Sequence, residues 1–236
     1  MNRILRMVLK NIFFVPGAWI KLCRYAKHPE NYEEMEMYRH IQTFMTRAVK
    51  SGNVDLQVFG QENIPAENGF LLCGNHQGLF DVVALVANFP GPLAAVFKKE
   101  LGNAPFLKQL IACTKSFSMD REDVRQSLTV IQAVTAELKK GRSYLIFPEG
   151  TRSKNGNRMG QFHSGSFRCA VKAKAPIVPF AFVDSFKVLD QKGSKKVRVQ
   201  LHYLPVIPYE EYKDMNTVEI ADMVKSRIQA VLDEYA

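Results

Sequence analysis

Residues 70–92 read FLLCGNHQGLFDVVALVANFPGP and point directly to a fold class. They begin with a continuous apolar run at residues 70–73, which is typical of a strand buried on both faces. After a polar loop, residues 81–89 are mostly apolar and end at a Pro-Gly-Pro sequence, where a helix must stop. A buried strand joined by a short loop to a helix is the repeating unit of α/β domains.

The same alternation continues along most of the chain. Apolar or alternating runs predict further strands at 54–58, 93–97, 144–147, 177–183 and 197–203. Apolar residues at helical spacing predict further helices at 35–49, 106–112, 124–138, 166–174 and 220–231, with Asn31, Asp120 and Asn216 as N-caps of the first, third and last. The sequence therefore predicts an α/β fold with a largely parallel central sheet covered by helices.

The positive charge of the chain is concentrated at its N-terminus. The 236 residues carry a net charge of +9, and residues 1–29 contain six Lys or Arg and no acid. A nucleic-acid-binding protein more often spreads its charge over a face, so this distribution argues against nucleic acid and favours an anionic lipid surface. We expect residues 1–50 to form a basic amphipathic helical segment that associates with a membrane, and residues 51–236 to form the α/β domain.

The longest apolar run lies in that segment, at residues 12–20. A spanning helix needs about 20 apolar residues, so this run of nine is too short, and it lacks the cleavage site of a signal peptide. We expect an interfacial helix that Pro16-Gly17 breaks into two pieces and that places Phe13 and Trp19 among lipid headgroups. The alternative is a terminal helix packed on its own domain.

The four cysteines lie tens of residues apart, unlike a zinc site or a disulfide framework. Isolated cysteines in apolar runs are usually buried side chains in a reducing compartment. Together with the N-terminal segment, they predict a peripheral or monotopic protein on the cytoplasmic face of the cell membrane.

Two polar loops follow predicted strands, where α/β folds gather their ligands. The first contains His76 and Asp81. A carboxylate bound to one ring nitrogen of a histidine fixes its tautomer and leaves the other nitrogen free to act as a general base. On one continuous helix the two residues would point about 140° apart, so the pairing requires a turn, which Gly78 can provide. The alternative is an N-cap aspartate beside an unrelated loop histidine.

The second loop, residues 148–153, reads PEGTRS and follows the predicted strand at 144–147. An arginine, small hydroxyls and a flexible backbone offer the donors that a phosphate needs. Lys98 follows the strand at 93–97 and could join Arg152 on the same anion. Each feature alone is also compatible with an ordinary surface loop.

Other catalytic patterns are missing from the sequence. It contains no GxSxG, Walker or GxGxxG motif, no cysteine in a nucleophile context and no histidines at metal-ligand spacing. We therefore expect neither a covalent nucleophile nor a bound metal. A general base beside an anion site suits direct transfer of a group to a hydroxyl or amine of a phosphate-bearing acceptor.

Several of these residues form motifs in a recognisable order. Residues 75–81, NHQGLFD, resemble the NHxxxxD motif of the glycerophospholipid acyltransferase family, and residues 147–153 resemble its FPEGTRS motif. Residues 98–105, KKELGNAP, are similar to its KxELxxxP block, and Val178-Pro179 matches its hydrophobic–proline motif. The resemblance covers about residues 50–205 and is strongest to bacterial lysophosphatidic acid acyltransferases.

The resemblance implies a reaction and a role for each motif residue. His76, oriented by Asp81, would deprotonate the sn-2 hydroxyl of 1-acyl-glycerol 3-phosphate, which would attack the thioester of acyl-CoA or an acyl carrier protein and give phosphatidic acid without a further cofactor. The residues expected to hold the acceptor phosphate are Lys98, Gly150, Thr151 and Arg152. Those expected to organise the motifs are Asn75, Glu149, Ser153 and, on the acyl-donor side, Pro179.

The chain departs from the family pattern at two places. Lys108 stands where a glycine is usual, and Phe162-His163 occupy a stretch where a lysine is common. Two alternatives remain at this point: the same chemistry on glycerol 3-phosphate, another lysophospholipid or an amino-acid lipid, and a lipid-binding protein without catalysis. The paired histidine argues against the second, because binding alone does not need a held base.

Overall fold

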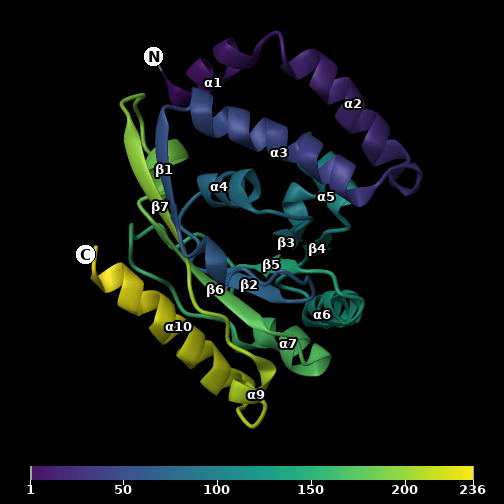
Figure 1. Ribbon diagram of the computed structural model, residues 1–236, viewed down its shortest axis with the longest axis vertical. Helices are drawn as coiled ribbons and strands as arrows, with labels where there is room; N and C mark the ends of the chain where they lie inside the picture. Colours follow the sequence, from purple (N-terminus) through teal and green to yellow (C-terminus); the bar gives the residue numbers. More distant parts are fainter. Residues whose placement is uncertain (1, 236) are drawn as a thin grey trace.

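A seven-stranded sheet in the order β1-β7-β6-β2-β5-β3-β4 is the middle layer of the computed structural model, which describes residues 2–235 (Figure 1). Its strands are β1 (Val54–Phe59), β2 (Leu71–Gly74), β3 (Ala94–Lys98), β4 (Phe117–Met119), β5 (Tyr144–Ile146), β6 (Ile177–Val183) and β7 (Val197–Tyr203). All six strands that the sequence predicts are present. The sequence missed β4 at the sheet edge, because its three residues are only partly buried and Ser118 interrupts the apolar run that marks the equally short β5.

The strand directions confirm a largely parallel sheet. β2 runs parallel to both β5 and β6, and β3 runs parallel to both β4 and β5. β1 and β7 are parallel to each other, while β7 is antiparallel to β6. The carboxyl ends of the adjacent strands β2, β5 and β3 therefore lie at the same end of the sheet, which is where the motif loops begin.

Helices cover both faces of the sheet. One face carries α3, α4 and α5, and the other carries α6, α7 and α10 (Figure 1). The helices are α1 (Arg3–Asn11), α2 (Val15–Lys27), α3 (Glu34–Ser51), α4 (Phe80–Asn88), α5 (Leu107–Thr114), α6 (Val124–Lys139), α7 (Arg168–Ala173), α8 (Phe186–Leu189), α9 (Tyr209–Tyr212) and α10 (Thr217–Asp233). Short 3₁₀ helices are η1 (Pro29–Asn31), η2 (Gln61–Asn63), η3 (Lys99–Leu101) and η4 (Ser164–Phe167).

The two helical layers explain why the central strands are continuously apolar. Leu71 belongs to the apolar core beneath α6, α7 and α10, whereas Leu72 belongs to the core beneath α3, α4 and α5. Both side chains are fully buried. Each leucine stabilises the fold by about 1.5–3 kcal/mol through its removal from water.

The helix caps test the sequence predictions at single residues. Asn216 caps α10 as predicted, and Glu219 completes the capping box. The prediction for Asp120 is wrong: Asp123, next to the first turn of α6, accepts hydrogen bonds from the backbone N–H groups of that turn. The prediction for Asn31 is also wrong, because Asn31 lies in η1 and α3 begins after Glu33.

The N-terminal helices form an additional layer that packs on the α3 side (Figure 1). The chain turns at residues 12–14, not at Pro16-Gly17 as predicted. Pro16 lies in the first turn of α2, where a helix does not need its missing N–H group. The predicted boundary between residues 50 and 51 falls in the last turn of α3. Leu22 and Tyr25 of α2 belong to the same apolar core as the sheet.

Two of the six N-terminal cations bind protein rather than facing outward. Arg3 is buried and donates hydrogen bonds to the carbonyl oxygens of Gly52 and Lys195, the second at 2.9 Å. Arg6 donates to the carbonyl oxygen of Ser51 at 3.1 Å. Burial, with the neighbouring Arg6 charge, lowers the pKa of Arg3. These arginines cap the carboxyl end of α3 and fix α1 against it.

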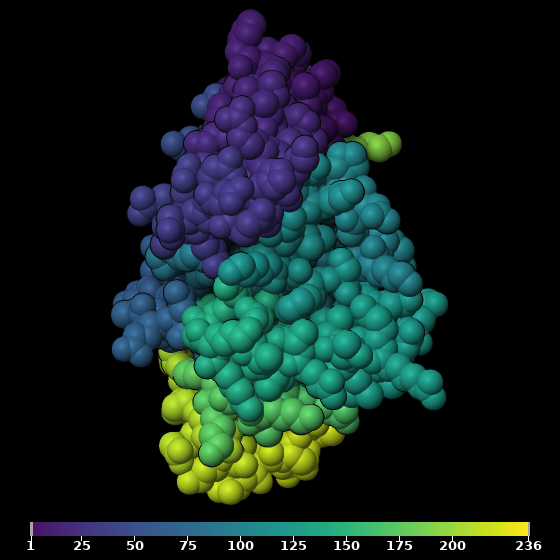
Figure 2. All heavy atoms as spheres, turned by 90° about the vertical axis from the view of Figure 1, so that its right-hand side faces the viewer, coloured from purple at the N-terminus to yellow at the C-terminus, as the bar shows by residue number. Residues whose placement is uncertain are grey.

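The outward face of α1 and of the turn that follows it is apolar. Phe13 in the turn is 99% exposed. The other large exposed apolar side chains of this N-terminal layer are Ile4, Leu5, Val8 and Leu9 of α1, Ile12 of the turn, and Val15 and Ile20 of α2. Trp19, by contrast, is half-buried against the core, so only part of its ring is available for the predicted contact with headgroups. Figure 2 shows the N-terminal helices gathered at one end of the molecule. Across residues 2–235, no helix is both long enough and apolar enough to span a bilayer.

Candidate active site

His76 and Asp81 meet in the loop after β2. The imidazole Nδ1 of His76 lies 2.7 Å from Oδ2 of Asp81, so the turn at residues 77–79 brings together two residues that a continuous helix would separate. The structure thus shows the predicted pairing. Asp81 is in the first turn of α4 and is fully buried, whereas the His76 side chain keeps 18% of its surface exposed.

The carboxylate of Asp81 receives four hydrogen bonds. Oδ2 accepts from His76, from the backbone N–H of Gln77 at 2.7 Å and from that of Gly78 at 3.1 Å. Oδ1 accepts from the hydroxyl of Ser185, which follows β6. Buried carboxylates need such donors to offset the loss of water. The environment therefore fixes the carboxylate before any substrate arrives.

This pairing also fixes the tautomer of His76. An ionised carboxylate only accepts hydrogen bonds, so Nδ1 carries the proton and Nε2 keeps a free lone pair. The imidazole stacks on the ring of Phe147 at 4.1 Å between centroids, with 19° between the ring planes. Phe147 packs edge-on against Phe180, so the imidazole has a rigid apolar support. This arrangement leaves Nε2 as the ring nitrogen that can take a proton.

Glu149 bridges the two motif loops. Its Oε1 accepts from the backbone N–H of His76, and its Oε2 accepts from the backbone N–H of Gly160, each at 2.7 Å. The side chain is buried. Burial raises the pKa of the Glu149 carboxyl, and the two backbone hydrogen bonds partly offset that rise. A carboxylate used in this way is a structural bridge, which agrees with its expected role in organising the loop.

Of the three other predicted residues, Asn75 and Ser153 bond to the backbone and Pro179 lies within a strand. The side-chain amide of Asn75 bonds both the N–H and the carbonyl of Phe182, at 2.7 and 2.9 Å, and so extends the pairing of β2 with β6. The backbone N–H of Ser153 donates to the carbonyl of His76 at 2.8 Å. Pro179 is buried inside β6 opposite Cys73 and does not line the apolar cavity described below.

The predicted phosphate residues are only partly brought together. Gly150 has a φ of +68°, a left-handed conformation that suits glycine, and a Cβ there would lie 3.1 Å from the ring of His163. Thr151 is exposed and Arg152 is half-buried, with its guanidinium paired to Asp190. Lys98 is exposed and pairs with Glu100 at 3.0 Å, so its partner here is a neighbouring acid in η3.

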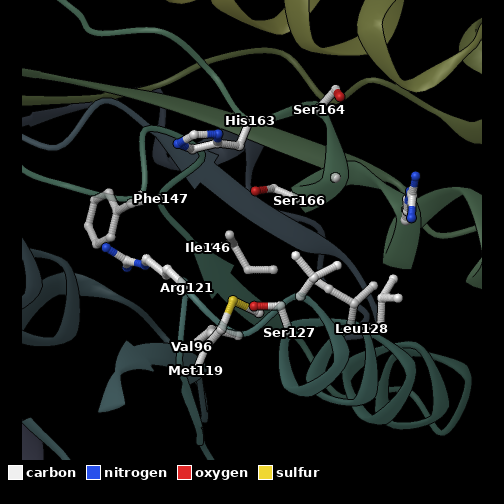
Figure 3. A pocket seen from close by; sticks show the side chains of 15 residues that line it. Val96, Met119, Arg121, Ser127, Leu128, Ile146, Phe147, His163, Ser164 and Ser166 are labelled. Atoms are coloured by element: carbon white, nitrogen blue, oxygen red, sulfur yellow. The ribbon is translucent and has the colours of Figure 1, made fainter. Parts of the chain in front are cut away.

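An apolar cavity of about 400 Å³ opens beside this loop (Figure 3). It lies between α6, the ends of β3 and β5, and η4. Phe147 and Gly150 belong to its wall, so the cavity begins at the ring that supports His76. Its apolar lining residues include Val96, Met119, Leu128, Ile131 and Ile146. His163, one of the two departures from the family pattern, lies over Gly150 at the same wall.

The polar groups of the site suit proton transfer and anion binding. Within the described residues, no cluster of three or more His, Cys, Asp or Glu side chains could hold a metal ion. Burial raises the pKa of the Cys73 and Cys169 thiols, which keeps both protonated. A histidine with a free Nε2 can accept a proton from a hydroxyl group, and Arg152 lies on the loop bonded to the backbone of that histidine.

Comparisons with known proteins identify the family of the chain. A family model described as Acyltransferase matches residues 55–183. The 1-acyl-sn-glycerol-3-phosphate acyltransferase of Helicobacter pylori is 33% identical over 139 residues, which are 59% of this chain and 57% of that protein. The sheep (Ovis aries) 1-acyl-sn-glycerol-3-phosphate acyltransferase alpha is 27% identical over 235 residues, 94% of this chain and 77% of that protein.

A solved structure shows the same fold. The crystal structure of the 1-acyl-sn-glycerophosphate (LPA) acyltransferase PlsC from Thermotoga maritima superposes with a TM-score of 0.79 at 21% identity and covers 99% of this chain and 97% of that chain. Because the family model spans more than half of the sequence, the chain belongs to the acyltransferase family, a family of transferases.

Sequence reasoning missed several residues that complete the site. Ser185 and Asp190 lie more than a hundred residues from the loop that they contact. Gln77 accepts from the backbone N–H of Ser185 at 2.9 Å and donates to Asn157 at 2.9 Å. Gln77 is inside the first motif, but no sequence pattern around Ser185 or Asn157 marks them as its partners. A serine or aspartate in a loop becomes part of a site only when the fold brings it there.

The bridge at Glu149 gives a test of loop stability. In Glu149→Gln, the amide NH₂ group faces one of the two backbone N–H groups, at His76 or Gly160. An unsatisfied buried donor costs about 1–3 kcal/mol, so the free energy of unfolding should fall by about that amount. Urea denaturation measures the change. Glu210→Gln, which removes an exposed carboxylate paired with Lys213, is the matched control. Equal stability of the two variants would refute the bridge.

Proposed function

We propose that this protein transfers a fatty acyl group from acyl-CoA or an acyl carrier protein to the sn-2 hydroxyl of 1-acyl-glycerol 3-phosphate, forming phosphatidic acid. The observation that carries the proposal is the bond between His76 and the buried carboxylate of Asp81, beside a loop that carries Arg152. The similar proteins from Helicobacter pylori and sheep are named for the same acceptor, 1-acyl-sn-glycerol 3-phosphate, which supports the proposal.

In the proposed reaction, Nε2 of His76 takes the proton of the acceptor hydroxyl while the hydroxyl oxygen attacks the thioester carbonyl carbon. Asp81 stabilises the imidazolium that forms and holds its orientation. The tetrahedral intermediate then collapses, the carbon–sulfur bond breaks, and the proton on Nε2 passes to the leaving thiolate. The products are an ester and a free thiol, so the step needs no metal and no redox partner.

Arg152 and the backbone of Gly150 and Thr151 supply donors for the acceptor phosphate in this proposal. A guanidinium binds phosphate through two parallel hydrogen bonds and keeps its charge at any physiological pH. Glu149 links this loop to the backbone of His76, so the distance between phosphate and base is set by the protein. The contribution of Lys98 requires it to leave Glu100, with which it is paired.

The apolar cavity is the proposed site for the acyl chain. It has about 400 Å³ of space and begins at Phe147, the ring on which His76 stacks. In this proposal the carbonyl end of the acyl chain lies at Phe147, next to His76, and burial of the chain is favourable by about 0.8 kcal/mol for each methylene. Figure 3 shows the cavity walls formed by Ile146 and by Leu128 of α6.

The N-terminal helices are the proposed membrane contact. The apolar face of α1 continues through Phe13, and the exposed cations of this layer are Lys10 of α1 and Lys21, Arg24 and Lys27 of α2, of which Lys21 pairs with Glu36 at 3.6 Å. Arg3 and Arg6 are excluded from this set because they bind the end of α3. An exposed apolar face beside cations binds anionic membrane surfaces by burying apolar area among headgroups. The proposal is therefore a peripheral or monotopic protein, with the cytoplasmic face of the membrane carried over from the sequence analysis.

Substitution of His76 tests the reaction. His76→Ala removes the general base, and acyl transfer should fall by about 10²- to 10⁴-fold with the fold intact. The assay uses an acyl-CoA and an acyl carrier protein as donors, with 1-acyl-glycerol 3-phosphate, glycerol 3-phosphate and a lysophosphodiester as acceptors. The control is His28→Ala, at an exposed histidine. Turnover by His76→Ala at the control rate would exclude the base, and preference for another acceptor would replace the proposed substrate.

The cavity can be filled at Gly165, which lines it and has nothing within 4 Å of its would-be Cβ. Gly165→Leu should shift the preferred acyl chain toward shorter lengths, because the new side chain takes up cavity volume. Rates with a series of acyl-CoA lengths measure the shift. Gly91→Leu, also in open space but away from the cavity, should keep the parent profile. An unchanged length profile in Gly165→Leu would place the acyl chain elsewhere.

The membrane contact can be tested with the pair of substitutions Leu9→Glu and Phe13→Glu, at residues that are 52% and 99% exposed. Two carboxylates in the apolar face oppose both insertion and attraction to anionic lipid. Binding to vesicles that contain phosphatidylglycerol, measured by co-sedimentation, should be lost. Val218→Glu, on an exposed position of α10, should bind normally. Retained binding by the double variant would rule out this face as the contact.

A further inference from the structure

The guanidinium that we assign to the acceptor phosphate is already occupied by a carboxylate of the same chain. Arg152 pairs through NH1 with Oδ1 of Asp190, and the second oxygen of Asp190 accepts from the backbone N–H of Leu79 at 3.2 Å. Asp190 directly follows α8 and lies at the surface. Donors from both motif loops therefore converge on one negatively charged group, as they would on a phosphate.

The loop after β2 is shaped to receive this carboxylate. A Cβ at Gly78 would lie 2.5 Å from Oδ2 of Asp190 and 3.1 Å from Cα of Phe186. Any larger residue at position 78 would push the carboxylate away from the N–H of Leu79. The close approach is thus a feature of two segments that are 111 residues apart in the chain. It differs from an incidental surface ion pair, which would need no such fit.

We propose that Asp190 occupies the acceptor's phosphate position in the substrate-free enzyme and that it sets the affinity for the acceptor by competing for Arg152. This inference rests on the proposed function, because it takes Arg152 as the phosphate ligand. A phosphate monoester carries a charge of about −1.5 to −2 at pH 7, whereas a carboxylate carries −1. The phosphate therefore binds the Arg152 guanidinium more strongly and displaces the Asp190 carboxylate. Like charges then drive Asp190 away, and the exposed side chain can rotate into water.

The competition between Asp190 and the acceptor phosphate can be measured as a change in the acceptor KM. If the Asp190-paired state holds about 70–90% of the free enzyme, it weakens apparent acceptor binding by about three- to tenfold. Asp190→Asn removes the charge and keeps the shape, so the amide oxygen can still accept from Leu79. The KM for 1-acyl-glycerol 3-phosphate should therefore fall by about three- to tenfold, and the Ki of inorganic phosphate as a competitor of the acceptor should fall by the same factor. The KM for acyl-CoA should stay unchanged.

The 236-residue protein on vesicles is compared with five variants, which are Asp190→Asn, Asp190→Glu, Arg152→Ala, the double variant Arg152→Ala/Asp190→Asn and Glu210→Gln. Glu210→Gln, which removes a distant exposed carboxylate, controls for the change in net charge and should match the parent enzyme. Arg152→Ala should raise the acceptor KM, and Asp190→Asn should have no further effect in the Arg152→Ala background. Asp190→Glu should keep the competition in part, because it keeps the charge.

The outcomes separate the two proposals. An acceptor KM that is unchanged or higher in Asp190→Asn, with Arg152→Ala still impaired, overturns the competition and makes Asp190 a residue that orients Arg152. If Arg152→Ala has the parent KM and the parent Ki for inorganic phosphate, the phosphate assignment of the proposed function fails first. A fall in KM that persists in the Arg152→Ala background also overturns the inference, because the effect would not pass through Arg152.

Discussion

The rest of the site depends on the hydrogen bonds that the buried carboxylate of Asp81 accepts. A carboxylate that loses its water is stable only when hydrogen-bond donors replace it, and here they come from an imidazole, two backbone N–H groups and the hydroxyl of Ser185. Meeting that demand fixes the turn after β2, the start of α4 and the segment after β6. The geometry of His76 is therefore set during folding, and substrate binding does not have to create it.

A second carboxylate, Glu149, joins this arrangement to the loop after β5. Its two oxygens hold the backbone at His76 and at Gly160, so the proposed base and the proposed phosphate donors belong to one rigid unit. The apolar cavity starts at Phe147 on the same unit. The His76–Asp81 pair, the loop that carries Arg152 and an apolar cavity thus meet at the carboxyl ends of adjacent strands, and the proposed direct transfer depends on this closeness of the three.

The sequence predicted the repeating elements well and the irregular ones poorly. The strands β2, β5 and β6 are continuously apolar, and α6 and α10 are long enough to show a helical period. It missed β4, which is short and contains Ser118 between two apolar residues, and it assigned the N-cap of α6 to Asp120 where the structure has Asp123. At the N-terminus, the sequence analysis assigned all six Lys and Arg residues to the same role, contact with an anionic lipid surface. The fold uses Arg3 and Arg6 as ligands for the end of α3, which no local pattern reveals.

The primary sequence was sufficient for the α/β class and the strand ends that carry the motifs, because these depend on hydrophobic period and on residues close together in the chain. It offered the pairing of His76 with Asp81 as one of two possibilities, and the turn seen in the folded chain decided between them. The roles of Ser185 and Asp190, the cavity beside Phe147 and the pairing of Lys98 with Glu100 depended on the folded chain. The physical reason is the distance over which each interaction acts. Hydrogen bonds and ion pairs act over a few ångströms, and only packing of the sheet and helices brings residues that are a hundred positions apart within that range.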